Sequence, residues 1–409
     1  MRQSLLVAAA ASTMLVAALG GTASARPASV ADTSNGYIVV LNDSAAPAKV
    51  ASDHATKYGA EVDYLYRAAL KGYAAHMSAS AAARLADDSR VLFVQRDGLV
   101  HATAQTLPTG INRADAELSP IAKINGLDER VNVDVAVIDT GVDLDHPDLN
   151  VYTAGAKNCS TGKSADDGNG HGTHVAGTIG ALDNASGVVG MAPGARIWPV
   201  RVLDNRGSGS WSAVICGIDY VTRHASKIEV VNMSLGGGGA DDGNCGNTNN
   251  DVMHKAICRS VAAGITYVVA AGNSAADAST FVPAAYDEVI TVSALADFDG
   301  IPGGVGAASC RSDVDDTFAN FSNYGVDVDI IAPGVCIKST WKGGGYNTIS
   351  GTSMASPHVA GGAALYKSKN TSATPDQVKA ALLNAGTTDW NSTDGRDLIK
   401  EPLLNVFSF

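Results

Sequence analysis

The sequence is poor in charged and aromatic side chains and has no excess of basic residues. Of its 409 residues, 17% are charged and 6% are aromatic, and 29 Lys and Arg residues stand against 41 Asp and Glu residues, for a formal net charge of −12. A protein with this net charge is not attracted electrostatically to nucleic acid or to an anionic membrane. We therefore expect a soluble protein that binds neither. We also expect it to be a monomer. Its length allows one large core and a small accessory domain.

Long apolar segments are missing everywhere except at the N-terminus. Residues 1–4 are short and positively charged, residues 5–19 are apolar, and Ala23-Ser24-Ala25 forms an A-x-A cleavage site. This is the pattern of a secretory signal peptide. A membrane anchor is the alternative, but the apolar run is shorter than the roughly 20 residues of a spanning helix. We predict that residues 1–25 are removed and that the protein is extracellular.

Cysteine is absent from the first 150 residues, and no two cysteines form a C-x-x-C pair. In an exported chain an even number of cysteines favours disulfides over metal thiolates or a catalytic thiol. The sequence leaves the connectivity open. Our prediction is Cys159–Cys216, Cys245–Cys258 and Cys310–Cys336, in which the two later pairs close short loops.

Residues 36–103, which contain no cysteine, form a unit of their own. The pattern predicts strands at 37–41, 61–66, 73–77 and 91–94 and helices at 46–58 and 79–86. The order β-α-β-β-α-β is that of a split, ferredoxin-like α+β unit. The unit ends in a loose stretch around Gly98 that suits a cleavable boundary.

Residues 104–409 contain no internal repeat, and strands alternate with helical segments. We predict strands at 131–138, 196–203, 228–233, 266–271, 289–294 and 327–331. Several of these are continuous apolar runs, as expected for parallel strands buried on both faces. The sequence therefore predicts one α/β domain of about 300 residues with a mostly parallel sheet.

Three side chains with complementary chemistry each lie in a glycine-rich turn. Asp139 closes an apolar strand, His171 is flanked by Gly170 and Gly172, and Ser353 precedes a helix of small residues. A serine hydroxyl is a weak nucleophile that needs a base and a group to orient that base. Alone, Asp139 or Ser353 could be a helix cap; together with His171 they indicate a catalytic triad.

Two further polar residues accompany this pattern. Asn273 ends another apolar strand, where its amide could stabilise an oxyanion or simply form a turn. His171 and His174 could form a metal pair, but their spacing lacks the glutamate of H-E-x-x-H. We expect His174 to be a packed structural histidine.

Three motifs give the chain a resemblance to a known family. They are V-I-D-T-G-V-D at 137–143, H-G-T-H-V-A-G-T at 171–178 and G-T-S-M-A-S-P-H-V-A-G at 351–361. From residue 104 onward the chain resembles the subtilases, the serine proteases of the subtilisin and proteinase K type. The resemblance implies a three-layer α/β domain with a mostly parallel central sheet. It also implies that Ser353 is the nucleophile, His171 the base, Asp139 its orienting group and Asn273 an oxyanion donor.

The resemblance further implies a peptide-binding cleft and a pro-domain. One strand would carry Ser234, Leu235 and Gly236, the facing strand Ser208, Gly209 and Trp211, and the primary pocket Ala271 and Gly272. We expect broad cleavage after apolar or aromatic residues, although Trp211 could instead pack in the core. The unit at 36–103 would be an inhibitory and chaperone-like pro-domain, cut near Thr103/Ala104, unless it is an unrelated binding domain.

Calcium is the cofactor that the resemblance implies, as a stabiliser. Its ligands would be Gln105, Asp148, Leu182, Asn184, Ser186 and Val188. Six oxygen donors of this kind suit Ca²⁺. A second, weaker site would lie near Asp287, Val289 and Asp329.

Three other functions are alternatives for this sequence. An acid-active serine-carboxyl peptidase uses a glutamate as base, which His171 argues against. A processing protease for basic residues usually carries an additional C-terminal β-domain, and nothing of domain size follows Ser353. An inactive binding protein on this fold would not need all four active-site groups. The sequence favours a broad-specificity endopeptidase.

Overall fold

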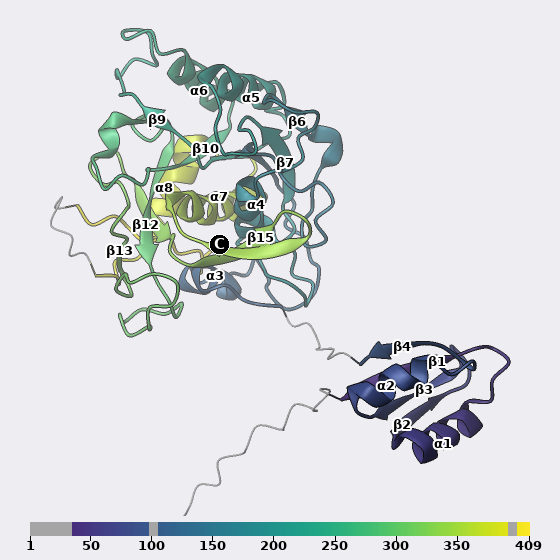
Figure 1. The fold of residues 1–409 in the computed structure, drawn as a ribbon. Helices are drawn as coiled ribbons and strands as arrows, with labels where there is room; N and C mark the ends of the chain where they lie inside the picture. Colours follow the sequence, from purple (N-terminus) through teal and green to yellow (C-terminus); the bar gives the residue numbers. More distant parts are fainter. Residues whose placement is uncertain (1–34, 98–104, 392–398) are drawn as a thin grey trace, which may run out of the picture. The chain divides into compact units, whose positions relative to one another are not determined.

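The computed structural model describes residues 35–97, 105–391 and 399–409. The chain separates into two compact units, Met1–Ala102 and Thr103–Phe409 (Figure 1). The predicted signal peptide and the predicted cut near residue 103 lie outside the described residues. Within the described part of the chain, no helix is long and apolar enough to cross a membrane.

The first unit is a four-stranded antiparallel sheet with two helices. In chain order it contains β1 (Gly36–Leu41), α1 (Pro47–Tyr58), β2 (Glu61–Tyr66), β3 (Gly72–His76), α2 (Ala79–Ala86) and β4 (Val91–Arg96). The strands are arranged β2-β3-β1-β4. The predicted β-α-β-β-α-β order is therefore confirmed. Val39, Tyr73 and Leu85 are buried together in the core that joins the sheet to the helices.

The second unit is built on a mostly parallel eight-stranded sheet. Its strands are β5 (Asp134–Asp139), β6 (Lys157–Asn158), β7 (Arg196–Arg201), β8 (Val230–Met233), β10 (Thr266–Ala270), β12 (Ile290–Ala296), β13 (Thr317–Phe318) and β14 (Ile330–Pro333). The order is β13-β12-β10-β8-β5-β7-β6, and β14 also pairs with β12. Every pair in this sheet is parallel except β12 with β13.

Helices cover both faces of this sheet (Figure 1). The helices are α3 (Thr109–Arg113), α4 (His171–Gly180), α5 (Trp211–Arg223), α6 (Val252–Ala262), α7 (Thr352–Lys369) and α8 (Pro375–Ala385). Along β5, Val135 and Val137 join the core with α4, α7 and α8, whereas Ala136 and Ile138 join the core with α5 and α6. This alternation confirms the predicted three-layer α/β architecture, since successive side chains of a strand point to opposite faces.

The six predicted sheet strands are present, with shorter or shifted bounds. The largest differences are at the N-terminal ends, where β5 begins at Asp134 and β14 only at Ile330. Four short strands and one hairpin were not predicted. They are β6, β13, β9 (Gly237–Gly238), β11 (Phe281–Val282) and the hairpin of β15 (Ile337–Trp341) and β16 (Gly345–Ile349). The three predicted disulfides are all formed.

The predicted catalytic residues gather at one edge of the sheet. Asp139 is the last residue of β5, and Asn273 follows the end of β10. His171 is the first residue of α4 and Ser353 the second of α7. Carboxyl ends of parallel strands and N-termini of the following helices meet at this edge, which is where ligands bind in open α/β sheets.

Candidate active site

Asp139 and His171 are joined by a hydrogen bond, which becomes an ion pair when His171 is protonated. Nδ1 of His171 lies 2.8 Å from Oδ1 of Asp139, which is fully buried, while the His171 side chain keeps 25% of its exposure. The backbone N–H of Thr140 donates to the same oxygen at 2.6 Å. Burial lowers the pKa of His171, but the Asp139 carboxylate outweighs this effect and raises that pKa above its ordinary value. His171 can therefore accept a proton and hold it against a partner of opposite charge.

The backbone around His171 leaves no room for side chains. Gly170 has a φ of 114°, and a Cβ there would overlap the ring of Trp341. A Cβ on Gly172 would overlap the carbonyl oxygen of Gly141. These close approaches need glycine and fix the start of α4 against β5.

Sequence reasoning missed a buried aspartate that holds this turn. Asp167 accepts hydrogen bonds from the N–H groups of Gly170 and Thr173 and from the hydroxyls of Thr140 and Thr173. The Thr140 hydroxyl in turn accepts the N–H of Gly172 at 3.0 Å. The sequence does contain a signal for this role, because Asp167 lies four residues before His171 and aspartate is favoured near the N-terminus of a helix.

Ser353 is anchored to the end of β8. Its hydroxyl donates to the carbonyl oxygen of Ser234 at 3.3 Å, and the Ser234 hydroxyl donates to the carbonyl oxygen of Ser353 at 2.9 Å. Among the described contacts, no hydrogen bond joins Ser353 to His171. Ser234 and His171 line the same cavity, whereas Ser353 is not among its lining residues. Catalytic hydrogen bonds are often loose in free enzymes and tighten when substrate binds.

Asn273 is exposed and held by the N-terminus of α7. Its Oδ1 accepts the N–H and the hydroxyl of Thr352 at 2.8 and 3.0 Å, and that hydroxyl accepts the N–H of Gly272 at 3.1 Å. Because two donors occupy the amide oxygen, the Nδ2 group is the one left to donate elsewhere. Thr352 was not predicted as a site residue.

A cavity of about 730 Å³ opens beside His171. Six of the eight predicted substrate-binding residues line it, namely Ser208, Gly209, Trp211, Ser234, Leu235 and Gly236. Trp211 is 42% exposed, so it does not pack in the core. Ala271 and Gly272 are not among the residues that line this cavity. Ala271 is buried and its carbonyl oxygen accepts a hydrogen bond from Asn323.

Residues that sequence reasoning missed complete this cavity. Leu203 and Val214 add apolar surface beside Trp211, and Arg206 adds a positive charge.

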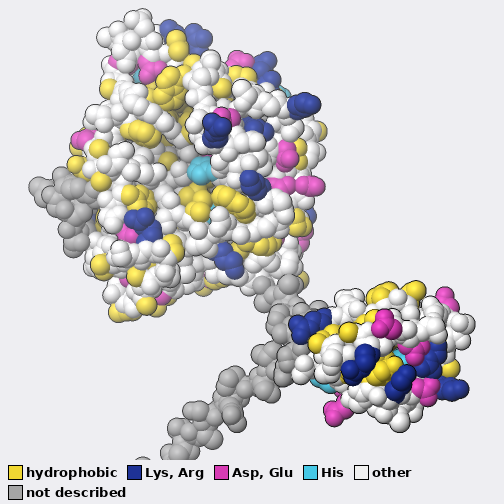
Figure 2. Space-filling view, in the orientation of Figure 1, with side chains coloured by type: hydrophobic (Ala, Val, Ile, Leu, Met, Phe, Trp, Pro, Cys, Tyr) yellow, Lys and Arg dark blue, Asp and Glu magenta, His cyan; other side chains and the backbone are white. Residues whose placement is uncertain are grey.

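On the face shown in Figure 2, Lys and Arg side chains are scattered among acidic and neutral ones rather than gathered.

The six predicted calcium ligands come together near the N-terminus of the second unit. Gln105 Nε2 donates to the carbonyl oxygens of Leu182 and Val188 at 2.6 and 3.2 Å, and Asn184 Nδ2 donates to Asp148 at 2.9 Å. Asp148 is buried, and this burial raises its pKa. If the two amides rotated by 180°, their oxygens would join three carbonyls and one carboxylate in an all-oxygen set, which fits calcium. The rotation of Asn184 would give up the two hydrogen bonds that its Oδ1 accepts from Ser186.

A lysine side chain lies where the second cation site was predicted. The ammonium group of Lys379 lies 2.8 Å from Asp329 Oδ1 and donates to the carbonyl oxygens of Val289 and Asp287 at 2.9 and 3.4 Å. A positive charge from the chain itself stands where the ion was expected, and it would repel a metal ion. The prediction of a second cation site at Asp287, Val289 and Asp329 is therefore wrong.

His174 lies in the core, away from the Asp139–His171 pair. Its Nε2 bonds the carbonyl oxygen of Ile337 at 2.9 Å, and burial lowers its pKa to about 3. The expected structural role agrees with this geometry, because the ring is buried and bonded to the backbone of another segment.

Comparison with known proteins identifies the family. Residues 131–399 match the Subtilase family and residues 36–103 match the family Peptidase inhibitor I9. The chain is 40% identical to an extracellular serine proteinase of Thermus sp. (strain Rt41A), over 83% of this chain and 76% of that protein. It is 37% identical to subtilisin E of Bacillus subtilis (strain 168), over 90% of both.

A solved structure agrees with these sequence comparisons. A cold-adapted subtilisin-like serine proteinase superposes with a TM-score of 0.54 at 34% identity, covering 72% of this chain and 98% of the other. The chain thus belongs to the subtilase family and is a subtilisin-like serine endopeptidase with an inhibitor I9 domain before its peptidase domain.

Proposed function

We propose that Ser353, His171 and Asp139 form the catalytic triad of a secreted, broad-specificity endopeptidase. The hydrogen bond between Asp139 and His171 carries this proposal, because it supplies a base that is oriented and electrostatically supported. His171 takes the proton of the Ser353 hydroxyl as that oxygen attacks the scissile carbonyl. It then gives the proton to the leaving amine, and the same exchange with water releases the acyl group.

The negative oxygen of each tetrahedral intermediate needs donors that are already in place. Asn273 Nδ2 and the backbone N–H of Ser353 are our candidates. The amide is fixed through Oδ1 by Thr352, and the N–H belongs to the first turn of α7. Charge that develops near fixed donors and a helix N-terminus is stabilised without reorganisation.

The substrate would lie as an extended strand against Ser234–Leu235–Gly236, facing Ser208, Gly209 and Trp211. Support comes from the cavity that these residues share with His171. Pairing through the main chain gives broad specificity. The apolar walls formed by Leu203, Trp211 and Val214 favour apolar side chains on the substrate, and we propose apolar or aromatic residues before the cut, with Ala271 and Gly272 at the primary pocket.

We propose that the chain is an exported zymogen that acts as a monomer. Residues 1–25 would be the signal peptide, residues 36–103 an intramolecular inhibitor and residues 104–409 the mature enzyme, with the cut near Thr103/Ala104. The inhibitor family match supports this organisation. So do Tyr64, Leu92 and Phe93, apolar side chains that the outer strands β2 and β4 leave exposed, since such groups commonly mark a binding surface.

Calcium would be held by Gln105, Asp148, Asn184 and the carbonyls of Leu182, Ser186 and Val188. The gathering of these groups around one buried carboxylate supports the proposal. The ion would supply stability and no chemistry, since the loop is built from residues outside the proposed triad.

Processing of the full chain tests the proposed function. In the wild type we expect a new N-terminus near residue 104 and cleavage of peptides that carry Phe, Tyr or Leu before the cut. The Ser353→Ala chain should retain its pro-domain, whereas Ser368→Ala, elsewhere on α7, should be processed normally. Autoprocessing of Ser353→Ala in the absence of other proteases would contradict the assignment. A preference for dibasic peptides would overturn only the specificity.

A further inference from the structure

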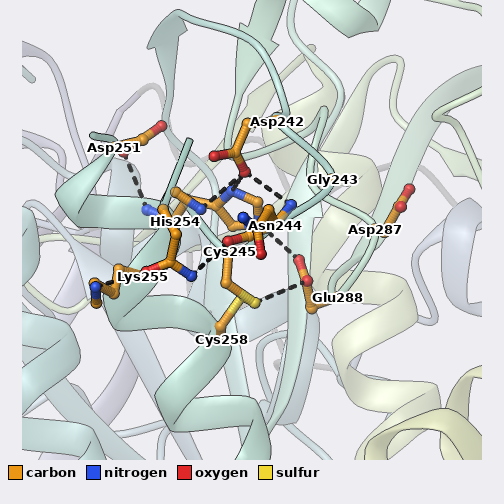
Figure 3. The surroundings of a disulfide bond; sticks show 12 residues. Asp242, Gly243, Asn244, Cys245, Asp251, His254, Lys255, Cys258, Asp287 and Glu288 are labelled. Atoms are coloured by element: carbon orange, nitrogen blue, oxygen red, sulfur yellow. Dashed lines mark hydrogen bonds and ion pairs between the residues drawn. A yellow bond between two sulfur atoms is a disulfide. The ribbon is translucent and has the colours of Figure 1, made fainter. Parts of the chain in front are cut away.

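His254 lies in an unusual setting on α6, far in sequence from the proposed triad. Its side chain is completely buried, and carboxylates face both ring nitrogens (Figure 3). Nε2 lies 2.9 Å from Oε2 of Glu288, a hydrogen-bond distance. On the other side, Nδ1 lies 3.5 Å from Oδ1 of Asp241 and 3.4 Å from Oδ1 of Asp242.

Nδ1 of His254 has no hydrogen-bond partner among the described residues. If Nε2 carries the proton that Glu288 accepts, the lone pair of Nδ1 points at two carboxylate oxygens. Electron-rich atoms this close repel each other in a buried site unless a positive charge lies between them. The two candidates for that charge are a second proton on the ring and a metal ion.

The two aspartates are held in place by the backbone rather than by basic side chains. Asp242 accepts N–H groups from four residues, namely Asn244, Gly246, Thr248 and Asn249. Asp241 accepts the N–H groups of Gly243 and Asp287. Among the described ion pairs, no Lys or Arg contacts Asp241, Asp242 or Glu288. The neighbouring Lys255 bonds Asn247 instead.

We propose that Asp241, Asp242 and His254 bind one divalent transition-metal ion of the zinc class, with Glu288 as a positioning residue. Ligands about 2.0–2.1 Å from a tetrahedral zinc ion are about 3.3–3.4 Å from one another. The separations of 3.4 and 3.5 Å around Nδ1 match this spacing. An imidazole that gives its other N–H to a carboxylate is the usual arrangement of a metal-binding histidine.

The identity of the donors selects the class of metal. Calcium and magnesium take oxygen ligands, whereas imidazole together with carboxylates suits zinc and its neighbours. The ring of Tyr286 stacks on His254 at 4.0 Å, and the Tyr286 hydroxyl donates to Asp251 at the start of α6. The imidazole is therefore fixed in orientation before any ion arrives. A water molecule would be the fourth ligand and would reach the ion from the side of Asp241, whose side chain is 18% exposed.

The position of the site gives it a structural role. The loop with Asp241 and Asp242 follows β9, which itself follows Ser234–Leu235–Gly236 of the cleft. The disulfide Cys245–Cys258 ties the same loop to α6. A metal ion between this loop and His254 would be a second cross-link, and it would stabilise the segment that leads away from the cleft.

Zinc titration of the purified mature protein tests the proposal. The protein is freed of metal with a chelator, kept inactive by a serine protease inhibitor and titrated with ZnCl₂ in a calorimeter. We expect one Zn²⁺ per chain and a higher melting temperature. Asp241→Asn should bind at least about 10-fold more weakly and His254→Gln should lose the site, whereas the neighbouring Asp287→Asn should bind like the wild type.

Several outcomes would overturn the proposal. They are absence of zinc binding, equal affinity in Asp241→Asn and the wild type, and calcium binding at this site in place of zinc. Asp241→Asn keeps the test valid if His254→Gln fails to fold, because Asp241 lies at the surface of the cluster. X-ray absorption of the zinc-loaded protein should show nitrogen and oxygen ligands. A sulfur ligand would instead assign the metal to reduced Cys245 and Cys258.

Discussion

The N–H and the hydroxyl of Thr352 both donate to Oδ1 of Asn273, at 2.8 and 3.0 Å. This relationship favours Oδ1 of Asn273 on the side of Thr352, because the Thr352 N–H can only donate and would lose its hydrogen bond if the NH₂ group stood there. Nδ2 of Asn273 is consequently a donor whose position is fixed by the residue before Ser353. The same helix terminus would carry the nucleophile and orient the oxyanion donor.

Replacing Asn273 by Ala should lower kcat about 10²–10³-fold with little change in KM, because the lost hydrogen bond forms only as charge develops. Thr352→Val should cause a smaller loss, which Thr352→Ser restores. In the double variant the effect should not exceed that of Asn273→Ala alone. Steady-state kinetics on a peptide substrate measure these values, with the exposed Thr348→Val as control. Fully additive losses would show that Thr352 acts independently of Asn273.

The pH dependence of kcat/KM should report His171. Its pKa is raised, and the base must be neutral, so activity should fall as pH decreases through a midpoint above the ordinary histidine value of about 6.5. Asp139→Asn removes the charge that raises this pKa. It should move the midpoint to lower pH and reduce kcat by about 10⁴. An unchanged midpoint in Asp139→Asn would mean that another group controls the profile.

Chelation should destabilise the protein without blocking its chemistry. In protein loaded with calcium and free of zinc, we expect excess EDTA to lower the melting temperature, while activity measured well below that temperature changes little. Asp148→Asn should melt at a lower temperature in calcium and respond little to chelator. Asp329→Asn, whose carboxylate pairs with Lys379, is the matched control and should keep the full response to chelator. An identical response to EDTA in Asp148→Asn and the wild type would argue against this loop.

His358 should make the fold sensitive to acid. Burial lowers its pKa to about 4, so the unfolded chain binds a proton at higher pH than the folded one does. The stabilisation is complete above about pH 6.5 and is lost as pH falls toward 4, a difference of about 3 kcal/mol for one group. His358→Gln should flatten the free energy of unfolding between pH 7 and pH 4.5, measured with urea. The same slope as in the wild type would exclude this role.

The sequence predicted those parts of the site that depend on local pattern. Asp139 at the end of an apolar strand and His171 between two glycines each have a signature within a few residues. Contacts between residues far apart in the sequence were not predictable in this way. Thr352 donates a hydrogen bond to Asn273, 79 positions away in the sequence, and Lys379 donates one to Val289, 90 positions away. Such contacts exist only because the folded sheet brings distant loops to one edge.

The strands of the fold were also predicted only where a local sequence pattern marks them. Long apolar strands such as β5 and β10 were predicted because parallel strands buried on both faces leave a continuous signal. The two-residue strands β6, β9, β11 and β13 have no pattern of their own, and their pairing partners define them. Similarly, the hairpin β15–β16 turns at Gly343 and Gly344, two residues with positive φ that mark a turn but not which flanking residues pair.

Labelling of the nucleophile tests the central claim most directly. The purified mature protein would be treated with an organophosphate-type serine reagent, digested and analysed by mass spectrometry. We predict one labelled residue, Ser353, with loss of proteolytic activity in proportion to the label, and no labelling after heat denaturation, because activation depends on the folded Asp139–His171 pair. A label on another residue, or full activity with Ser353 completely modified, would contradict the account.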